Sequence, residues 1–174
     1  MPPRYAFLGP EGTFAHGALL SLPLGAHAEL VPFASVTLAI DAVRAGSADG
    51  ALVPMENSVE GAVPATLDEL AGPGEPLIIA SETYRPVAFH LLARDGTALA
   101  DVKTVATHPH AEAQVRRFLL DSLPGVEMHL LGSTAAGAAA VAAGEFDAAV
   151  ATEIAGCCTG CRRWRATSPT TAGR

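Results

Sequence analysis

Several features that would assign this chain to a particular class of protein are missing from it. No cysteine occurs before Cys157, so most of the chain has no framework of disulfide bonds. No apolar run approaches the ~20 residues that a membrane-spanning helix needs. The N-terminus lacks the pattern of a signal peptide, because a Gly-Pro loop follows only a short apolar run. We therefore expect a cytoplasmic protein.

Positive charge is also scarce and unevenly placed. Lys103 is the single lysine, the formal net charge is −7, and the segment after Gly156 contains four arginines and no acid. The rest of the chain is therefore strongly acidic, which argues against a nucleic acid as partner because phosphate binding uses clustered Lys and Arg. A small anionic ligand is compatible, since backbone amides and one or two cations can hold it.

What the sequence does contain is a regular alternation of apolar runs and capped amphipathic stretches. This alternation predicts an α/β fold with largely parallel sheets and helices on both faces. The predicted strands are residues 4–9, 28–35, 49–57, 77–94, 103–109, 126–133 and 147–152, and the predicted helices are residues 10–22, 35–46, 61–72, 109–123 and 133–144. No internal repeat is evident. A boundary near residues 76–84 predicts two lobes, of about residues 1–80 and 81–155, with a cleft between them.

The helix predicted at residues 35–46 has both a start and a stop signal. Ser35 is a candidate N-cap, and Gly46 is expected to end the helix. The face expected to be buried consists of Val36, Leu38, Ala39, Ala42 and Val43.

The first candidate binding loop is GPEGTF, residues 9–14, between a predicted strand and a predicted helix. Gly12 permits tight backbone geometry, Thr13 offers a hydroxyl, and the helix N-terminus presents N–H groups to an anion. The loop is not a P-loop, because the Gly-Lys-Ser/Thr ending is missing. An ordinary turn with a cap explains the loop equally well.

The second candidate is the polar end of the strand in VPMENSVEGAV, residues 53–63. In open α/β folds, side chains at the carboxyl ends of parallel strands face the crevice that binds ligands. Glu56, if buried, could donate a proton. Asn57 could orient a carboxylate or hydroxyl, and Ser58 follows it. Alternatively, Glu56 is exposed and Asn57 only forms an Asx turn.

Two further strand-to-helix junctions carry polar side chains. In THPHAEAQ, Thr107 and His108 end a strand and Gln114 lies on the next helix. In GSTA, Ser133 and Thr134 begin a helix. Together, these four junctions predict a cleft for an oxygen-rich small molecule.

The segments FLGPEGTFAHGAL, DGALVPMENSVEGAV, PVAFHLLAR, THPHAEAQVRRFL and STAAGAAAVA, in this order, resemble the catalytic domain of prephenate dehydratase. The resemblance covers about residues 4–155. It implies a two-lobed, periplasmic-binding-protein-like (type II) fold with the site between the lobes. It also implies conversion of prephenate to phenylpyruvate in phenylalanine biosynthesis, without a metal or organic cofactor. Members of this family form homo-oligomers.

The resemblance also implies roles for individual residues. Glu56, Asn57, Thr107 and Gln114 match catalytic positions, and substrate binding is implied for Gly12, Thr13, Ser58, His108, Ser133 and Thr134. Where some members have an acid before the Ser-Thr pair, this chain has Gly132. The family's later Thr-Arg-Phe motif and its phenylalanine-sensing ACT domain are not found, so we expect an incomplete second lobe and impaired activity.

Residues 156–174, GCCTGCRRWRATSPTTAGR, do not continue the family pattern. Read one frame over with GC-rich codons, the same nucleotides can spell LLYGLPALASDIADNRGA, which does continue it. We therefore expect an out-of-frame, disordered tail whose arginines lack acidic partners. A single Cys-x-x-C without further ligands is a poor zinc site.

Two functional alternatives remain for the whole chain. One is a non-catalytic, carboxylate-binding module of the periplasmic type. The other is an inert fragment with unpaired sheet edges.

Overall fold

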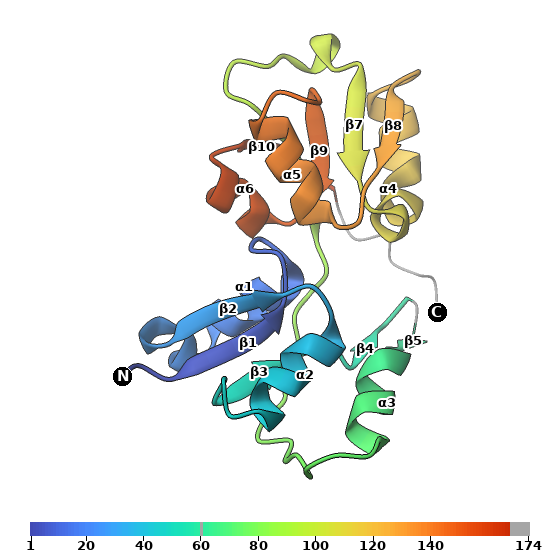
Figure 1. Ribbon diagram of the computed structural model, residues 1–174. Helices are drawn as coiled ribbons and strands as arrows, with labels where there is room; N and C mark the ends of the chain where they lie inside the picture. Colours follow the sequence, from blue (N-terminus) through green and yellow to red (C-terminus); the bar gives the residue numbers. More distant parts are fainter. Residues whose placement is uncertain (60, 168–174) are drawn as a thin grey trace. The chain divides into compact units, whose positions relative to one another are not determined.

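The computed structural model describes residues 1–59 and 61–167, which form two compact units (Figure 1). Unit 1 contains residues 1–10 and 14–85, and unit 2 contains residues 11–13 and those from 86 onward. The chain passes from one unit to the other at residues 85 and 86, whereas the sequence suggested a boundary near residues 76–84. Residues 11–13 belong to unit 2 although the chain on either side of them belongs to unit 1.

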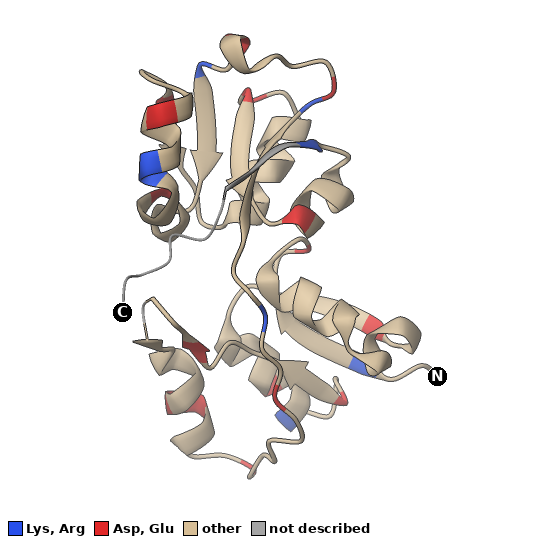
Figure 2. Ribbon diagram, turned by 180° about the vertical axis from the view of Figure 1, so that it is seen from behind, with Lys and Arg blue, Asp and Glu red and all other residues tan. Residues whose placement is uncertain are grey.

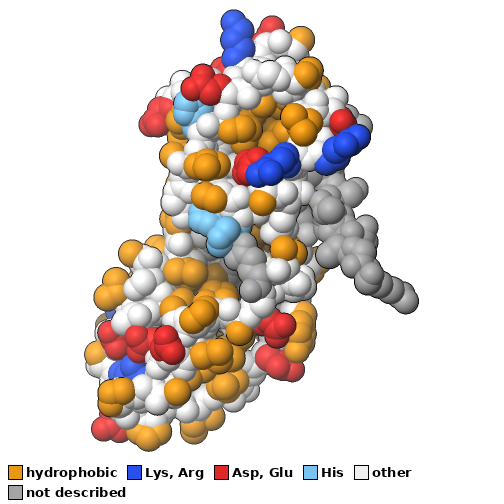
Figure 3. All heavy atoms as spheres, turned by 90° about the vertical axis from the view of Figure 1, so that its right-hand side faces the viewer, with side chains coloured by type: hydrophobic (Ala, Val, Ile, Leu, Met, Phe, Trp, Pro, Cys, Tyr) orange, Lys and Arg blue, Asp and Glu red, His pale blue; other side chains and the backbone are white. Residues whose placement is uncertain are grey.

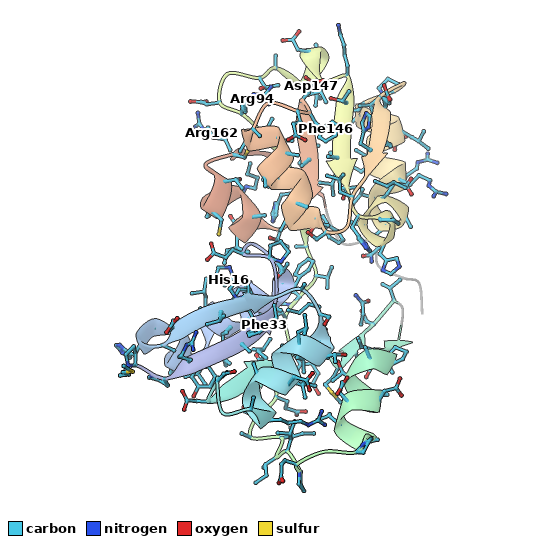
Figure 4. All side chains as sticks on the ribbon, in the orientation of Figure 1. His16, Phe33, Arg94, Phe146, Asp147 and Arg162 are labelled. Carbon is cyan, nitrogen blue, oxygen red and sulfur yellow. The ribbon has the colours of Figure 1, made fainter. Side chains whose placement is uncertain are left out.

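Unit 1 is built on a parallel sheet in which β1 (Arg4–Leu8) lies between β2 (Glu29–Phe33) and β3 (Gly50–Leu52). Parallel neighbours need crossover connections, and helices supply two of them. Its other elements are α1 (Phe14–Ser21), η1 (Pro23–His27), α2 (Val36–Arg44), the hairpin β4 (Glu56–Asn57) and β5 (Gly61–Ala62), and α3 (Pro64–Ala71). The buried imidazole of His16 (labelled in Figure 4) stacks on Phe7, with ring centroids 4.8 Å apart.

Unit 2 contains a five-stranded sheet in the order β10-β6-β9-β7-β8. Its elements are β6 (Phe89–Ala93), η2 (Leu99–Asp101), β7 (Thr104–Thr107), α4 (Pro109–Ser122), β8 (Glu127–Leu130), α5 (Thr134–Ala142), β9 (Ala148–Ala151), α6 (Glu153–Thr159) and β10 (Arg162–Thr167). Strands β7, β8 and β9 are parallel, whereas β6 and β10 run antiparallel to their neighbours. Helix α5 lies in front of the sheet and α4 behind it in Figure 1. These two units confirm the predicted two-lobed α/β fold class with mostly parallel sheets.

The two units repeat the same frame, which the sequence did not reveal. The order β2-β1-β3 in unit 1 matches β8-β7-β9 in unit 2. Ser35, the N-cap of α2, corresponds to Ser133, the N-cap of α5. Gly46 and Gly144 are separated by the same number of residues as these two serines, and both glycines have a positive φ. The repeat is hidden because the rest of α5 is almost entirely alanine and glycine, whereas α2 carries larger side chains.

In each unit, an aspartate directly before β3 or β9 bonds to the backbone at the start of the central strand, β1 or β7. The Asp49 carboxylate accepts a hydrogen bond from the Arg4 N–H (2.7 Å). The Asp147 Oδ2 accepts three, from the Lys103 and Thr104 N–H groups (2.9 Å each) and from the Thr104 hydroxyl (3.0 Å). These bonds hold the pKa of Asp147 below its ordinary value, because they favour the ionised form. Figure 4 labels Asp147 next to Phe146, whose carbonyl oxygen accepts a hydrogen bond from Arg94 (2.9 Å).

Small side chains allow close packing inside unit 2. All four residues of β9, Ala148–Ala151, are fully buried. A Cβ on Gly137 of α5 would lie 3.1 Å from the Ala106 carbonyl oxygen of β7. One core cluster joins β6, β9, α5 and α6 and consists of Leu92, Ala135, Ala138, Val141, Ala149, Ala151, Ala155 and Cys161.

The surface of the described residues is mixed in character. Acidic and basic residues lie along the chain of both units (Figure 2), and hydrophobic side chains are exposed on the face shown in Figure 3. Within residues 1–59 and 61–167, no helix is both long enough and apolar enough to cross a membrane.

The strand predicted at residues 49–57 ends as β3 at Leu52, and Glu56–Asn57 form the separate strand β4 of a hairpin. Two further secondary-structure predictions differ from the structure. In α2, Leu38 is 50% exposed and Ile40 is buried, so the buried face is turned relative to the one predicted. The long strand predicted at residues 77–94 is limited to β6, and residues 76–88 form no regular structure. Ile78 and Tyr84 are 91% and 85% exposed. Apolar composition was therefore not enough to form a strand here, because this segment has no neighbouring strand to pair with.

The expected disordered tail also differs from the structure up to residue 167. Helix α6 extends to Thr159, and β10 pairs with β6 from the Arg162–Ala93 pair onward. Arg162 forms an ion pair with Asp95 (2.8 Å), and Arg163 one with Glu153 (3.2 Å), so these two arginines do have acidic partners. Residues 168–174 lie outside the described part of the chain.

We predict that Asp147→Ala lowers the free energy of unfolding by about 2 kcal/mol, because two backbone donors lose a charged acceptor. Urea unfolding measures this loss. The contribution is present above the ordinary aspartate pKa of 3.8 and disappears as the pH falls through the lower folded-state value, so parent and variant should converge in acid. The control Asp121→Ala removes only an exposed ion pair with Arg117 and should change stability by less than about 0.5 kcal/mol. Equal losses in both variants would contradict the prediction.

Candidate functional site

The carboxyl ends of the parallel strands in unit 2 bring together most of the predicted site residues. Strand β7 ends at Thr107, β9 is followed by Thr152, and α5 begins at Thr134. The loop of residues 11–13 belongs to the same unit. Because carboxyl ends of parallel strands share one edge of a sheet, these segments converge there.

Gly12 is fixed at this edge by contacts on two sides. Its carbonyl oxygen accepts a hydrogen bond of 2.5 Å from the Thr152 hydroxyl. Its φ is +86°, and a Cβ at this position would lie 2.9 Å from the Ala155 Cα and 3.5 Å from the Ala135 Cβ. The positive φ and the close approach both require glycine here.

Thr152 is a site residue that the sequence motifs did not identify. It is the N-cap of α6, and its hydroxyl accepts a hydrogen bond from the Ala155 N–H (3.0 Å) while it donates to Gly12. The available signal was a threonine directly after a buried apolar strand and before Glu153, which is typical of a helix start. Its bond to a loop near the N-terminus could not be read from the local sequence.

Thr107, one of the four predicted catalytic residues, is fully buried. Its hydroxyl donates a 2.7 Å hydrogen bond to the Val150 carbonyl oxygen of the neighbouring strand β9. The hydroxyl proton is therefore used within the sheet, where it ties β7 to β9. In this structure the side chain supports the strand ends, whereas the resemblance implied that it faces the ligand.

The remaining predicted residues of unit 2 lie around the starts of α4 and α5. His108 is the N-cap of α4, and its Nδ1 accepts a hydrogen bond from the His110 N–H (3.3 Å). Ser133 caps α5 by accepting one from the Ala136 N–H (3.0 Å), which selects Ser133 over Thr134 as the cap. Gln114 on α4, Thr134 and Thr13 are each half-buried.

The predicted residues of unit 1 form a separate cluster on the β4–β5 hairpin. Glu56 pairs with Ala62, and Asn57 with Gly61. Glu56 and Ser58 are exposed, so Glu56 lacks the burial that the proton-donor hypothesis required. The Asn57 Oδ1 accepts a hydrogen bond from the Val59 N–H (2.8 Å), which is the Asx turn of the alternative interpretation.

His90 on β6 is a second residue that the sequence motifs did not identify. It is 7% exposed, and its Nδ1 has no hydrogen-bond partner among the described residues. Burial lowers its pKa, an effect opposed by Glu153 and reinforced by Arg163. Burial therefore favours the neutral imidazole.

The cysteines are not arranged as a metal centre. Cys157 and Cys158 are exposed, whereas Cys161 is buried and its thiol contacts the Ala138 carbonyl oxygen (3.8 Å). Burial raises the pKa of the Cys158 thiol, and Glu11 raises it further. In the described part of the chain, no three His, Cys, Asp or Glu side chains are grouped to hold a metal ion.

A cavity of about 290 Å³ lies away from these strand ends, and its lining includes Arg94, Arg162 and Arg163. It adjoins Ala93, which pairs with Ala148 at the beginning of β9. Arg162 and Arg163 are engaged in ion pairs, and Arg94 donates to the carbonyl oxygens of Val141 and Phe146. These cations already have partners, so this cavity is less suited to an anionic ligand than the strand ends.

The edge formed by β7, β9, α4 and α5 can therefore bind an oxygen-rich anion through neutral groups. The N-termini of α4 and α5 present N–H dipoles there, and Ser133 and Thr134 lie at the start of α5. Such groups stabilise negative charge on a ligand without bringing a compensating ion.

The family model and the curated relatives agree on one family. The sequence model of the family described as prephenate dehydratase matches residues 5–162. A prephenate dehydratase of Amycolatopsis methanolica is 55% identical over 152 residues, which are 87% of this chain and 49% of the relative. One of Mycobacterium ulcerans is 45% identical over 160 residues, which are 87% of this chain and 50% of the relative. The chain thus spans about half the length of these curated relatives.

Solved structures show the same fold. A prephenate dehydratase of Arthrobacter aurescens, crystallised in complex with L-Phe, superposes with a TM-score of 0.87 at 40% identity and covers 95% of this chain and 55% of that one. GqqA, described as a novel type of quorum quenching acylase, superposes with a TM-score of 0.83 at 29% identity and covers 97% and 60%.

We predict that Gly12→Ala destabilises the chain by about 2–4 kcal/mol, because a methyl group would meet Ala155 and the positive φ would be strained. The matched control is Gly144→Ala, which has a similar φ of +85° but open space around the new Cβ. It should cost only about 1 kcal/mol. Urea unfolding of the two variants measures the difference, and equal costs would show that the packing at Gly12 is unimportant.

Proposed function

Because this chain belongs to the prephenate dehydratase family, we propose that it binds prephenate and serves its conversion to phenylpyruvate in phenylalanine biosynthesis. The observation that carries this proposal is the family match over residues 5–162, which includes all four polar strand-to-helix junctions. A cytoplasmic location fits such a biosynthetic role.

The reaction requires little covalent chemistry from the protein. The ring C–O bond of prephenate breaks, and with one added proton the hydroxyl leaves as water. The ring C–C bond to the carboxylate also breaks, CO₂ leaves, and the electron pair of that bond completes the aromatic ring. Dipoles that are already oriented toward the two carboxylates and the departing hydroxyl can therefore supply most of the catalysis.

Unit 2 provides groups suited to the carboxylates. The N-termini of α4 and α5 offer backbone N–H groups, and their caps His108 and Ser133 order the first turns. Thr134 and Gln114 add a hydroxyl and an amide near these helices. We assign carboxylate binding to this set, with Thr107 holding β7 against β9 beneath it.

Unit 1 provides the only acid among the predicted catalytic residues. We propose that Glu56 assists departure of the hydroxyl and that Asn57 and Ser58 hydrogen-bond the substrate. Glu56 is exposed on its hairpin, so a role in proton transfer requires the substrate to shield it from water.

The fold alone does not determine the reaction, since a quorum quenching acylase shares it at 29% identity. The prephenate dehydratase relatives are considerably closer, at 45% and 55% identity. This difference favours the dehydratase reaction.

We also propose that residues from about 156 onward are read out of frame. The support is that one alternative frame can spell LLYGLPALASDIADNRGA, which resembles the family continuation. Resequencing of the gene tests this directly. An alternative frame that cannot encode Tyr-Gly-Leu at this point would contradict it.

We predict that this chain binds prephenate and that, in a chain with the alternative frame restored, Glu56→Gln lowers phenylpyruvate formation by about 100-fold or more, because general acid catalysis contributes at least that much. Phenylpyruvate is measured at neutral pH against a blank without protein, and prephenate binding is measured by calorimetry. The matched control is Glu82→Gln, an exposed glutamate outside the predicted site.

The restored and the unrestored chain, both without the substitution, are assayed in parallel. Turnover by the restored chain alone, with binding by both, would show that the unrestored chain binds substrate but lacks part of the catalytic apparatus. Absence of both binding and turnover in both chains would contradict the proposed function.

A further inference from the structure

We propose that Thr152 is a positioning residue for the ligand site of unit 2, acting through the orientation of the Gly12–Thr13 peptide. This inference rests on the proposed function, because it takes residues 11–13 as part of the prephenate site. Neither the family resemblance nor the polar motifs point to Thr152.

The hydrogen bond from Thr152 determines the orientation of the Gly12–Thr13 peptide plane. In a planar trans peptide the carbonyl and the following N–H point in opposite directions. The Gly12 carbonyl oxygen is bound by the Thr152 hydroxyl at 2.5 Å. The Thr13 N–H is therefore directed away from Thr152, and a rotation of the peptide would break this bond.

The Thr152 hydroxyl is itself held in place. It is 4% exposed, and it accepts a hydrogen bond from the Ala155 N–H while it donates to Gly12. Capping of α6 requires only the acceptor function of this oxygen. The donor function serves the loop, so the residue does more than begin a helix.

Steric contacts restrict the loop to the same place. Ala155 and Ala135 are 1% and 3% exposed and leave no room for a Cβ on Gly12. These two alanines prevent Gly12 from moving closer to α5 and α6, and the Thr152 hydroxyl fixes the Gly12 carbonyl. Together they hold Gly12 and Thr13 next to the first turn of α5, where Ser133 and Thr134 lie.

The test compares Thr152→Val, Thr152→Ser and Thr159→Val in the full chain. Thr159 is the matched control, because its hydroxyl bonds within α6, to the carbonyl oxygens of Ala155 (2.7 Å) and Gly156 (3.4 Å). Two readouts are used: amide hydrogen exchange at Gly12, Thr13 and Phe14 without ligand, and prephenate affinity by calorimetry.

We expect Thr152→Val to speed exchange at Thr13 and to weaken prephenate binding, each by about tenfold, as loss of one buried hydrogen bond implies. Thr152→Ser keeps the hydroxyl and should restore both values. Thr159→Val should alter neither, even if it lowers the unfolding temperature.

Each contrary outcome is distinct. If Thr152→Val binds prephenate as the parent does, Thr152 is only a helix cap and the inference fails while the proposed function stands. If the parent does not bind prephenate, the proposal that this chain binds prephenate fails. Exchange at Thr13 then still tests the orientation of the peptide, and unchanged exchange in Thr152→Val overturns the inference independently.

Discussion

Parallel pairing of the central strand in each unit is the constraint on which the rest of the structure depends. Strand β1 lies between β2 and β3, and β7 lies between β8 and β9, with all of these neighbours parallel. Parallel neighbours require crossovers, so the loops that follow the strands accumulate at one edge of the sheet. Unit 2 shows the consequence, because Thr107, Ser133 and Thr152 all lie at the ends of strands or just after them at that edge.

Small side chains make this edge of unit 2 accessible to other backbone segments. Ala135 and Ala155 stand where larger residues would fill the space, and Gly12 approaches them without a side chain of its own. The alanine-rich helix α5 contributes little apolar area per residue, but its small side chains let the Gly12 loop approach it closely. A methyl group added at Gly12 would require either the loop or α6 to move.

The sequence predicted well what is decided locally. Ser35 and Gly46 bound α2 as expected, because caps act through neighbouring backbone groups. It failed where distant contacts decide. Leu38 and Ile40 exchanged exposure according to how α2 packs, and the hydroxyls of Thr107 and Thr152 bond to backbone far along the chain. The sequence placed Thr107 correctly at the end of a strand, but its buried bond to Val150 is visible only in three dimensions.

The repeated frame explains why the glycine loop has no counterpart in unit 2. After β7, His108 caps α4 directly and Pro109 is its first residue. After β1, five residues, 9–13, precede the start of α1 at Phe14. Three of them, 11–13, belong to unit 2. The extra length gives Gly12 the reach to accept the Thr152 hydrogen bond, so a short insertion in one copy of the frame supplies part of the candidate site in the other.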